Sequence, residues 1–124
     1  MIEFEVLGNP ALYQTSSLAA WRTDIHNAAE KAANGRHAAI GTPVWVQAVF
    51  RLQRPESPPT QAIRPTARPD LDMLMRTSLD AMAGVLFADD SQVVSMAVSK
   101  VYALPDQAPG AVFKVSFGIE GYKG

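Results

Sequence analysis

Carboxylates dominate the stretch of the sequence whose residue types and spacing best suit chemistry. Asp70 and Asp72 follow Pro69 with one residue between them, and Asp90 ends the acidic pair Asp89-Asp90 further along the chain. Carboxylate oxygens are the hard ligands that Mg²⁺ prefers, and a bound Mg²⁺ typically completes its shell with waters and substrate phosphate. We therefore treat Asp70, Asp72 and Asp90 as candidate ligands of one or two Mg²⁺ ions.

A length argument predicts that these carboxylates meet. A helix from Asp70 to Gly84 rises about 21 Å at ~1.5 Å per residue. An extended chain from Gly84 to Asp90 returns roughly 20 Å at ~3.3 Å per residue. We therefore expect Asp90 near the start of this helix, beside Asp70 and Asp72, where a divalent cation would relieve the repulsion between the three acids.

Two further charged residues share a helix face with Asp72. Arg76 and Asp80 follow it at intervals of four residues, a spacing that also suits an ordinary surface ion-pair ladder. For Asp80 we favour that interpretation or a supporting role beside the ligands. The Arg76 guanidinium lies one turn from Asp72 and could donate hydrogen bonds to a phosphate.

The elements that must position these residues indicate an α+β fold. Apolar alternation and helical spacing predict strands at Ile2–Val6, Val44–Leu52, Gln92–Ala103 and Ala111–Ile119, and helices at Leu18–Asn34 and Asp70–Ala83. The order β-α-β-α-β-β predicts one domain over residues 1–124, with a mixed sheet and two helices packed on it. Five prolines between Arg54 and Pro69 predict a long Pro/Arg-rich loop at about 54–69.

Composition excludes several classes of protein. The 124 residues contain no cysteine, which rules out disulfides and thiolate chemistry, and the presence of only two histidines argues against a zinc site. No apolar run reaches the ~20 residues of a membrane span, and no signal peptide is recognisable, so we expect a cytoplasmic protein. The net charge is −1, but residues 51–68 hold four arginines against one glutamate, and residues 70–90 hold five aspartates against one arginine. This succession of a basic and an acidic stretch suits a metal site next to a basic surface that contacts phosphate groups.

Three segments taken together resemble a known family. Residues 70–76 (DLDMLMR), 79–82 (LDAM) and 89–94 (DDSQVV) are similar, at fitting intervals, to the RusA family of Holliday-junction resolvases. These are small endodeoxyribonucleases of bacteria and their prophages. The resemblance is strongest over about residues 68–100, a quarter of the chain, and its combined motif is far more specific than an isolated pair of aspartates.

The resemblance implies a homodimer that binds four-way DNA junctions and nicks two strands symmetrically in recombination and repair. It implies Mg²⁺ as the cofactor, with Mn²⁺ as a substitute, and no small-molecule cofactor or membrane. The essential acids of the family match Asp70, Asp72 and Asp90, and Asp89 matches a less critical neighbour.

Two positions depart from the family pattern. The catalytic lysine of the family falls at Arg76, which keeps the charge but does not readily release a proton. An asparagine of the family falls at Met73, so an amide is lost. A catalytically weak or inactive junction-binding architectural protein is therefore an open alternative, and a small interaction module whose acids merely cap a helix is a third.

Basic side chains are candidates for phosphate contacts on the DNA face. Besides Arg76 they are Arg51, Arg54, Arg64, Arg68 and Lys100. If they contact phosphates, the affinity for a junction should fall steeply with salt concentration.

Overall fold

The computed structural model describes residues 1–10, 18–54, 65–66 and 68–118. Its elements are β1 (Ile2–Leu7), α1 (Leu18–Ala33), β2 (Val44–Leu52), α2 (Leu71–Met82), the short 3₁₀ helix η2 (Asp90–Gln92), β3 (Val93–Tyr102) and β4 (Gly110–Phe117). The order expected from the sequence is confirmed, with ends that differ by one or two residues. Most of the Pro/Arg-rich loop, Arg64 included, lies outside the described residues.

The four strands form one mixed sheet in the order β1-β4-β2-β3. Strand β4 pairs antiparallel with both β1 and β2, whereas β3 pairs parallel with β2 and lies at the edge. Parallel neighbours need a crossover connection. Here the crossover from β2 to β3 runs through α2 and the turn at residues 83–89, so it carries all of the candidate acids.

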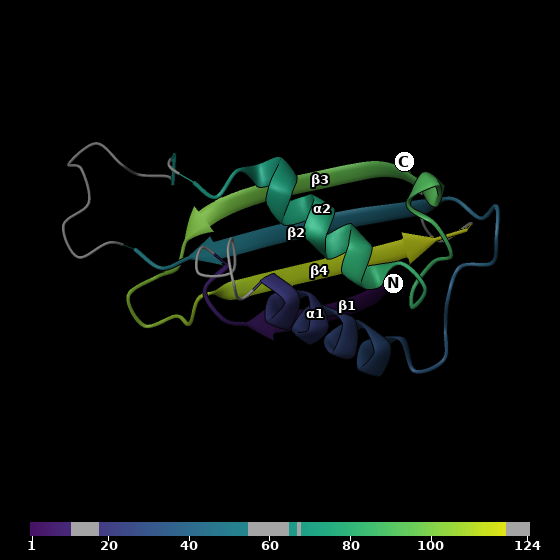
Figure 1. The fold of residues 1–124 in the computed structure, drawn as a ribbon, viewed down its shortest axis with the longest axis horizontal. Coiled ribbons are helices and arrows are strands. Elements are labelled where there is room, and N and C mark those ends of the chain that lie inside the picture. Colours follow the sequence, from purple (N-terminus) through teal and green to yellow (C-terminus); the bar gives the residue numbers. More distant parts are fainter. Residues whose placement is uncertain (11–17, 55–64, 67, 119–124) are drawn as a thin grey trace.

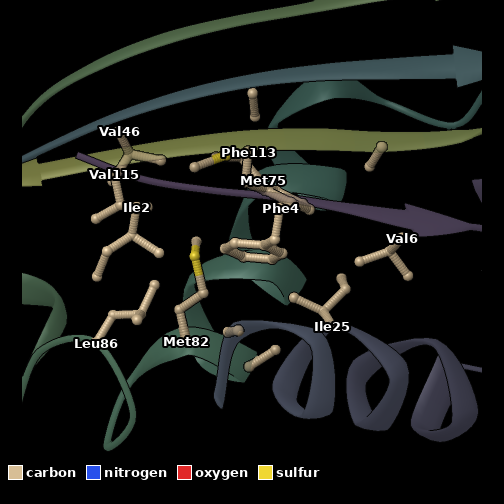
Figure 2. Close-up of a cluster of buried hydrophobic side chains, with 14 of the residues drawn as sticks. Ile2, Phe4, Val6, Ile25, Val46, Met75, Met82, Leu86, Phe113 and Val115 are labelled. Atoms are coloured by element: carbon tan, nitrogen blue, oxygen red, sulfur yellow. The ribbon is translucent and has the colours of Figure 1, made fainter. Parts of the chain in front are cut away.

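Both helices cover the same face of the sheet, with α1 along β1 and α2 close to β3 (Figure 1). Strand β1 shows why, because Ile2, Phe4 and Val6 are buried while the residues between them are exposed. The Phe4 and Phe113 rings stack at 5.1 Å between centroids, in the layer that also receives Ile25 of α1 (Figure 2). The hydrophobic core therefore fills the space between the sheet and the two helices.

Helix α2 turns one face to this core and the other to solvent. Leu74, Met75, Ser78, Ala81 and Met82 are buried, and the Ser78 hydroxyl donates to the Leu74 carbonyl at 2.8 Å. The face with Asp72, Arg76 and Asp80 is exposed. The helix is thus a rigid support that presents three charged side chains outward.

In the part of the chain that the structure describes, no helix is long and apolar enough to cross a membrane.

Candidate active site

An open pocket of about 320 Å³ lies between α2, η2 and β3. Its lining residues come from all three elements and are Asp72, Met75, Arg76, Leu79, Asp90 and Met96. The charged ones were expected from the sequence to act together, and Asp90 comes from a different segment than Asp72 and Arg76. The pocket thus combines two carboxylates, one guanidinium and an apolar wall.

Asp90 is held in a place that disfavours its negative charge. Partial burial raises the pKa of its carboxyl group, and the nearby charges of Asp80 and Asp89 raise it further, while Arg76 lowers it. The carboxylate therefore sits where an additional positive charge would be stabilising. Its electrostatic neighbours also place it beside the face of α2 that carries Arg76 and Asp80.

Its neighbour Asp89 has a structural role. The Asp89 carboxylate accepts a hydrogen bond from the Ser91 N–H at 2.9 Å. Hydrogen bonds from the side chain and the backbone of Ser91 lower the pKa of Asp89. Asp89 is the N-cap of η2. An N-cap carboxylate satisfies backbone donors that have no partner within the helix, so the acidic pair divides into a capping residue and a residue that faces the pocket.

Asp70 immediately precedes α2 and is not among the residues that line the pocket of Asp72 and Asp90. It occupies the N-cap position of α2, but its side chain makes no capping hydrogen bond. The residue before it is tied to the far part of β3, because the Lys100 ammonium donates to the Pro69 carbonyl at 2.8 Å. Asp90, by contrast, begins η2, three residues before the first residue of β3.

The structure places Asp90 on one pocket with Asp72, in the first turn of α2, and with Arg76 one turn further along the helix. The chain that follows the helix is compact. Both Val85 and Leu86 donate backbone hydrogen bonds to the Met82 carbonyl, and Gly84 donates to Phe87. The segment from Gly84 to Asp90 is therefore shorter than an extended strand at ~3.3 Å per residue, and Asp90 lies within electrostatic reach of Arg76 and Asp80.

The acidic residues fit a hydrated cation better than a closed metal cage. Among the described residues, no three carboxylate or imidazole side chains gather as ligands of one ion. Mg²⁺, however, usually takes only one or two carboxylates and completes its shell with waters and substrate phosphates. Asp72 and Asp90, on one pocket, supply that donor set.

The basic candidates occupy different environments. Arg51 is buried, with its guanidinium bound to the Glu5 carboxylate at 2.6 Å and to the Ala108 carbonyl at 3.1 Å. This gives Arg51 a structural role rather than a place on a DNA face. Arg54 is exposed and lies over the Tyr102 ring at 4.8 Å.

The remaining basic candidates divide in the same way. Arg68 is exposed, whereas Lys100 is half-buried and bonded to the segment that begins α2. Arg64 lies outside the described residues. Of the five candidates that accompany Arg76, Arg54 and Arg68 thus present exposed side chains.

Two residues near the acids were not expected from the sequence. Met96 of β3 lines the pocket opposite α2, and Gln92 of η2 bonds to the backbone beside Asp89. Gln92 had a usable signal, because an N-cap aspartate followed three residues later by glutamine is the pattern of a capping box. Met96 had none, since an exposed edge strand shows no clear alternation.

Comparison with known proteins gives the family. The chain matches the family model of endodeoxyribonuclease RusA over residues 4–112, and it therefore belongs to that family. This confirms the resemblance drawn from residues 70–94. The uncharacterized protein YqaN of Bacillus subtilis (strain 168) is 44% identical over 41 residues, which are 33% of this chain and 29% of that relative. The chain thus spans less than a third of the relative's length.

Proposed function

We propose that this protein is a structure-selective DNA endonuclease that resolves four-way junctions with the help of a divalent cation. The observation that carries the proposal is the position of Asp90, which lies on one pocket with Asp72 and Arg76 and whose pKa is raised by partial burial and then by the charges of Asp80 and Asp89. Perturbed acids in a pocket are typical of functional sites. Membership of the RusA family supports the same reaction class.

Asp72 and Asp90 are the proposed ligands of Mg²⁺, with Mn²⁺ as a substitute. A bound ion of this kind activates a water and stabilises charge on the leaving oxygen of a phosphodiester. The two carboxylates hold their positions because one is fixed on α2 and the other on a turn that is closed by its own cap. Support of this kind limits the reorganisation that accompanies the reaction.

Arg76 is the proposed phosphate contact in the pocket. Its guanidinium is exposed and close enough to Asp90 to lower the pKa of that group. Charge-assisted hydrogen bonds from arginine to phosphate are strong and directional. Arg76 therefore orients the scissile phosphate and offsets its charge, although it is poorly suited to release a proton.

Asp70 and Asp80 complete the acidic surface in this proposal. The Asp70 side chain makes no capping hydrogen bond to α2, so helix capping does not account for it. We keep Asp70, two residues before Asp72 at the start of the helix, as a further proposed ligand where the site binds two cations. Asp80 supports the site through its charge, which acts on Asp90.

We further propose that DNA lies along the exposed arginines and that two copies act together. Arg54 and Arg68 contact phosphates of the bound DNA, and Arg64 belongs to the same stretch of the sequence. A four-way junction has approximate two-fold symmetry, so a homodimer with two-fold symmetry would present one site to each of two opposed strands. The setting that suits this substrate is the cytoplasm of a bacterium, with the gene of bacterial or phage origin.

A gel assay with a synthetic four-way junction tests the proposal. Wild-type protein with Mg²⁺ is expected to nick the junction, to leave a linear duplex of the same sequence uncut, and to stop cutting in EDTA. Asp72→Asn is expected to retain junction binding and to lose nicking. Asp24→Asn is the matched control, because Asp24 is an exposed aspartate of α1.

The architectural alternative has its own support in Met73 and Arg76, which replace an amide and a lysine of the family pattern. It expects that wild-type protein binds the junction and cuts it with neither Mg²⁺ nor Mn²⁺. Binding without nicking in every protein tested would therefore replace the endonuclease proposal with the architectural one.

A further inference from the structure

The side-chain amide of Gln92 joins two loops that are distant in the sequence. Its Oε1 accepts hydrogen bonds from the backbone N–H groups of Ala88 at 2.8 Å and Asp89 at 3.1 Å. Its Nε2 donates to the backbone carbonyls of Ala39 at 2.9 Å and Thr42 at 3.1 Å. One side chain thus connects the turn that carries the acidic pair with the turn that leads into β2.

These four bonds use the full capacity of the amide. A glutamine side chain offers two N–H donors and one oxygen with two lone pairs, and all of them have backbone partners here. The side chain is 9% exposed although it belongs to a surface turn. The turn that receives it is itself closed, because the Thr42 N–H donates to the Ala39 carbonyl at 2.9 Å.

These hydrogen bonds involve the residues on both sides of Asp90. Gln92 and Asp89 form a reciprocal capping box, in which the Asp89 carboxylate accepts from Ser91 while the Gln92 oxygen accepts from the Asp89 N–H. The backbone on both sides of Asp90 is therefore fixed by side chains other than its own. The Asp90 carboxylate is left to face the pocket with Asp72 and Arg76.

The hydrophobic core does not include Gln92. The buried apolar cluster is formed by the sheet and the two helices, and Gln92 lies beyond it at the start of β3. Its contacts serve the acidic turn and the loop that supports that turn. A residue needed only for the fold would more often be apolar and bound to the core.

We propose that Gln92 is a positioning residue that holds Asp90 in its working place by fixing the acidic turn to the loop before β2. This inference rests on the proposed function, since it assigns Asp90 to the metal and phosphate site. In this role Gln92 acts on Asp90 through backbone hydrogen bonds rather than as a ligand of the cation or of the DNA. Partners that orient metal ligands typically contribute 10- to 100-fold in metal affinity or activity, and Gln92 acts in that manner through the backbone.

The test compares Gln92→Met with wild-type protein and with Gln47→Met. Methionine has nearly the length of glutamine but makes none of the four bonds. Gln47 is an exposed glutamine of β2, so its substitution controls for the change of residue type. The first readout is hydrogen exchange in metal-free protein, in which the Ala88 and Asp89 amides of Gln92→Met are expected to exchange about 10-fold faster or more.

The second readout is the kinetics of junction nicking. We expect kcat of Gln92→Met to fall about 10- to 100-fold and the Mg²⁺ concentration for half-maximal rate to rise about 10-fold. The KM for the junction should stay within about 3-fold of wild type, because the exposed arginines are untouched. Gln47→Met should match wild type in both readouts.

Gln92→Glu is the second variant if Gln92→Met does not fold. It keeps the oxygen acceptors for Ala88 and Asp89 and loses the bonds donated to Ala39 and Thr42. We expect it to retain slow exchange at Ala88 and Asp89 and to lose about 10-fold in kcat.

Wild-type kcat and Mg²⁺ dependence in a folded Gln92 variant would overturn the inference. Absence of nicking by wild-type protein would instead overturn the proposed function. The exchange readout keeps the two apart, because normal protection of Ala88 and Asp89 in Gln92→Met contradicts the positioning role whether or not the protein cuts DNA.

Discussion

Asp89 and Asp90 are adjacent in the chain, yet their carboxyl groups have pKa values shifted in opposite directions. The pKa of Asp89 is lowered by hydrogen bonds from Ser91, whereas the pKa of Asp90 is raised by partial burial and by the charges of Asp80 and Asp89. One carboxylate stabilises the turn and the other is destabilised by it. A pair of acids that share a turn can thus divide into a structural and a functional member.

Asp90→Asn should separate activity from stability. We expect nicking of a junction to fall more than about 100-fold, since loss of a proposed ligand exceeds the usual effect of its supporting partners. The melting temperature at pH 7 should equal that of the wild type or exceed it by up to about 2 °C, because a like charge is removed. Nicking rates and thermal unfolding measure the two effects.

The pH dependence of stability tests the sign of the effect of Asp90→Asn. A raised pKa means that ionised Asp90 destabilises the fold, so stability is regained as the pH falls through its folded pKa. The difference between Asp90→Asn and wild type should vanish below about pH 3. Asp106→Asn, in the exposed loop before β4, should change neither rate nor stability. Lower stability of Asp90→Asn at pH 7 would contradict the electrostatics.

Asp89→Ala should show the opposite pattern. The lowered pKa means that ionised Asp89 stabilises the fold above its unfolded pKa of about 3.9. This stabilisation is lost as the pH falls through the lower folded pKa. We expect a decrease in melting temperature of about 1–3 °C at pH 7 that disappears in acid. A decrease that persists at pH 2 would show that the cap does not act through its charge.

The sheet and helices could be predicted because local patterns determine them. Alternating burial in β1 and helical spacing in α2 are visible in the sequence, and the structure reproduces both. The exact position of Asp90 along α2 could not be predicted from such patterns. It depends on the backbone bonds of Gly84, Val85 and Leu86, which shorten the return path and follow from no periodicity.

Arg76 offers a test of the departure from the family pattern. Arg76→Ala should lower the nicking rate about 100-fold, because it removes the hydrogen-bond donor that stabilises the negative charge developing on the phosphate. Arg76→Lys keeps the charge and should stay within about 10-fold of wild type. Arg22→Ala, an exposed arginine of α1, is the control. Equal rates for Arg76→Ala and wild type would remove Arg76 from the site.

Arg54 and Arg51 should respond differently to the same substitution. Arg54→Ala removes an exposed cation and should reduce the slope of log affinity against log salt by about 1. Arg51→Ala should leave that slope unchanged and cost about 1–3 kcal/mol of stability, because Glu5 and the Ala108 carbonyl lose their donor. Salt titrations of junction binding and denaturant unfolding distinguish the two, and equal slopes for Arg54→Ala and wild type would exclude Arg54 from the DNA face.

The assignment of Arg51 shows where sequence analysis of a charged residue fails. Its side chain lies on a strand in a basic stretch of the sequence, and its partner Glu5 is on β1, with β4 between the two strands. Only the strand order brings the two charges together. Burial of arginine in an ion pair is a tertiary effect, and the count of local charges gives no sign of it.

The central claim is that Asp72 of α2 and Asp90 of the turn serve one site. A double-mutant cycle on the rate of junction nicking tests it most directly, with Asp72→Asn, Asp90→Asn and the double variant measured in Mg²⁺. Residues that act as a unit are strongly non-additive, so the double variant should be about as slow as the slower single variant. Losses that multiply across the cycle, or a wild-type protein that leaves the junction uncut, would contradict the claim.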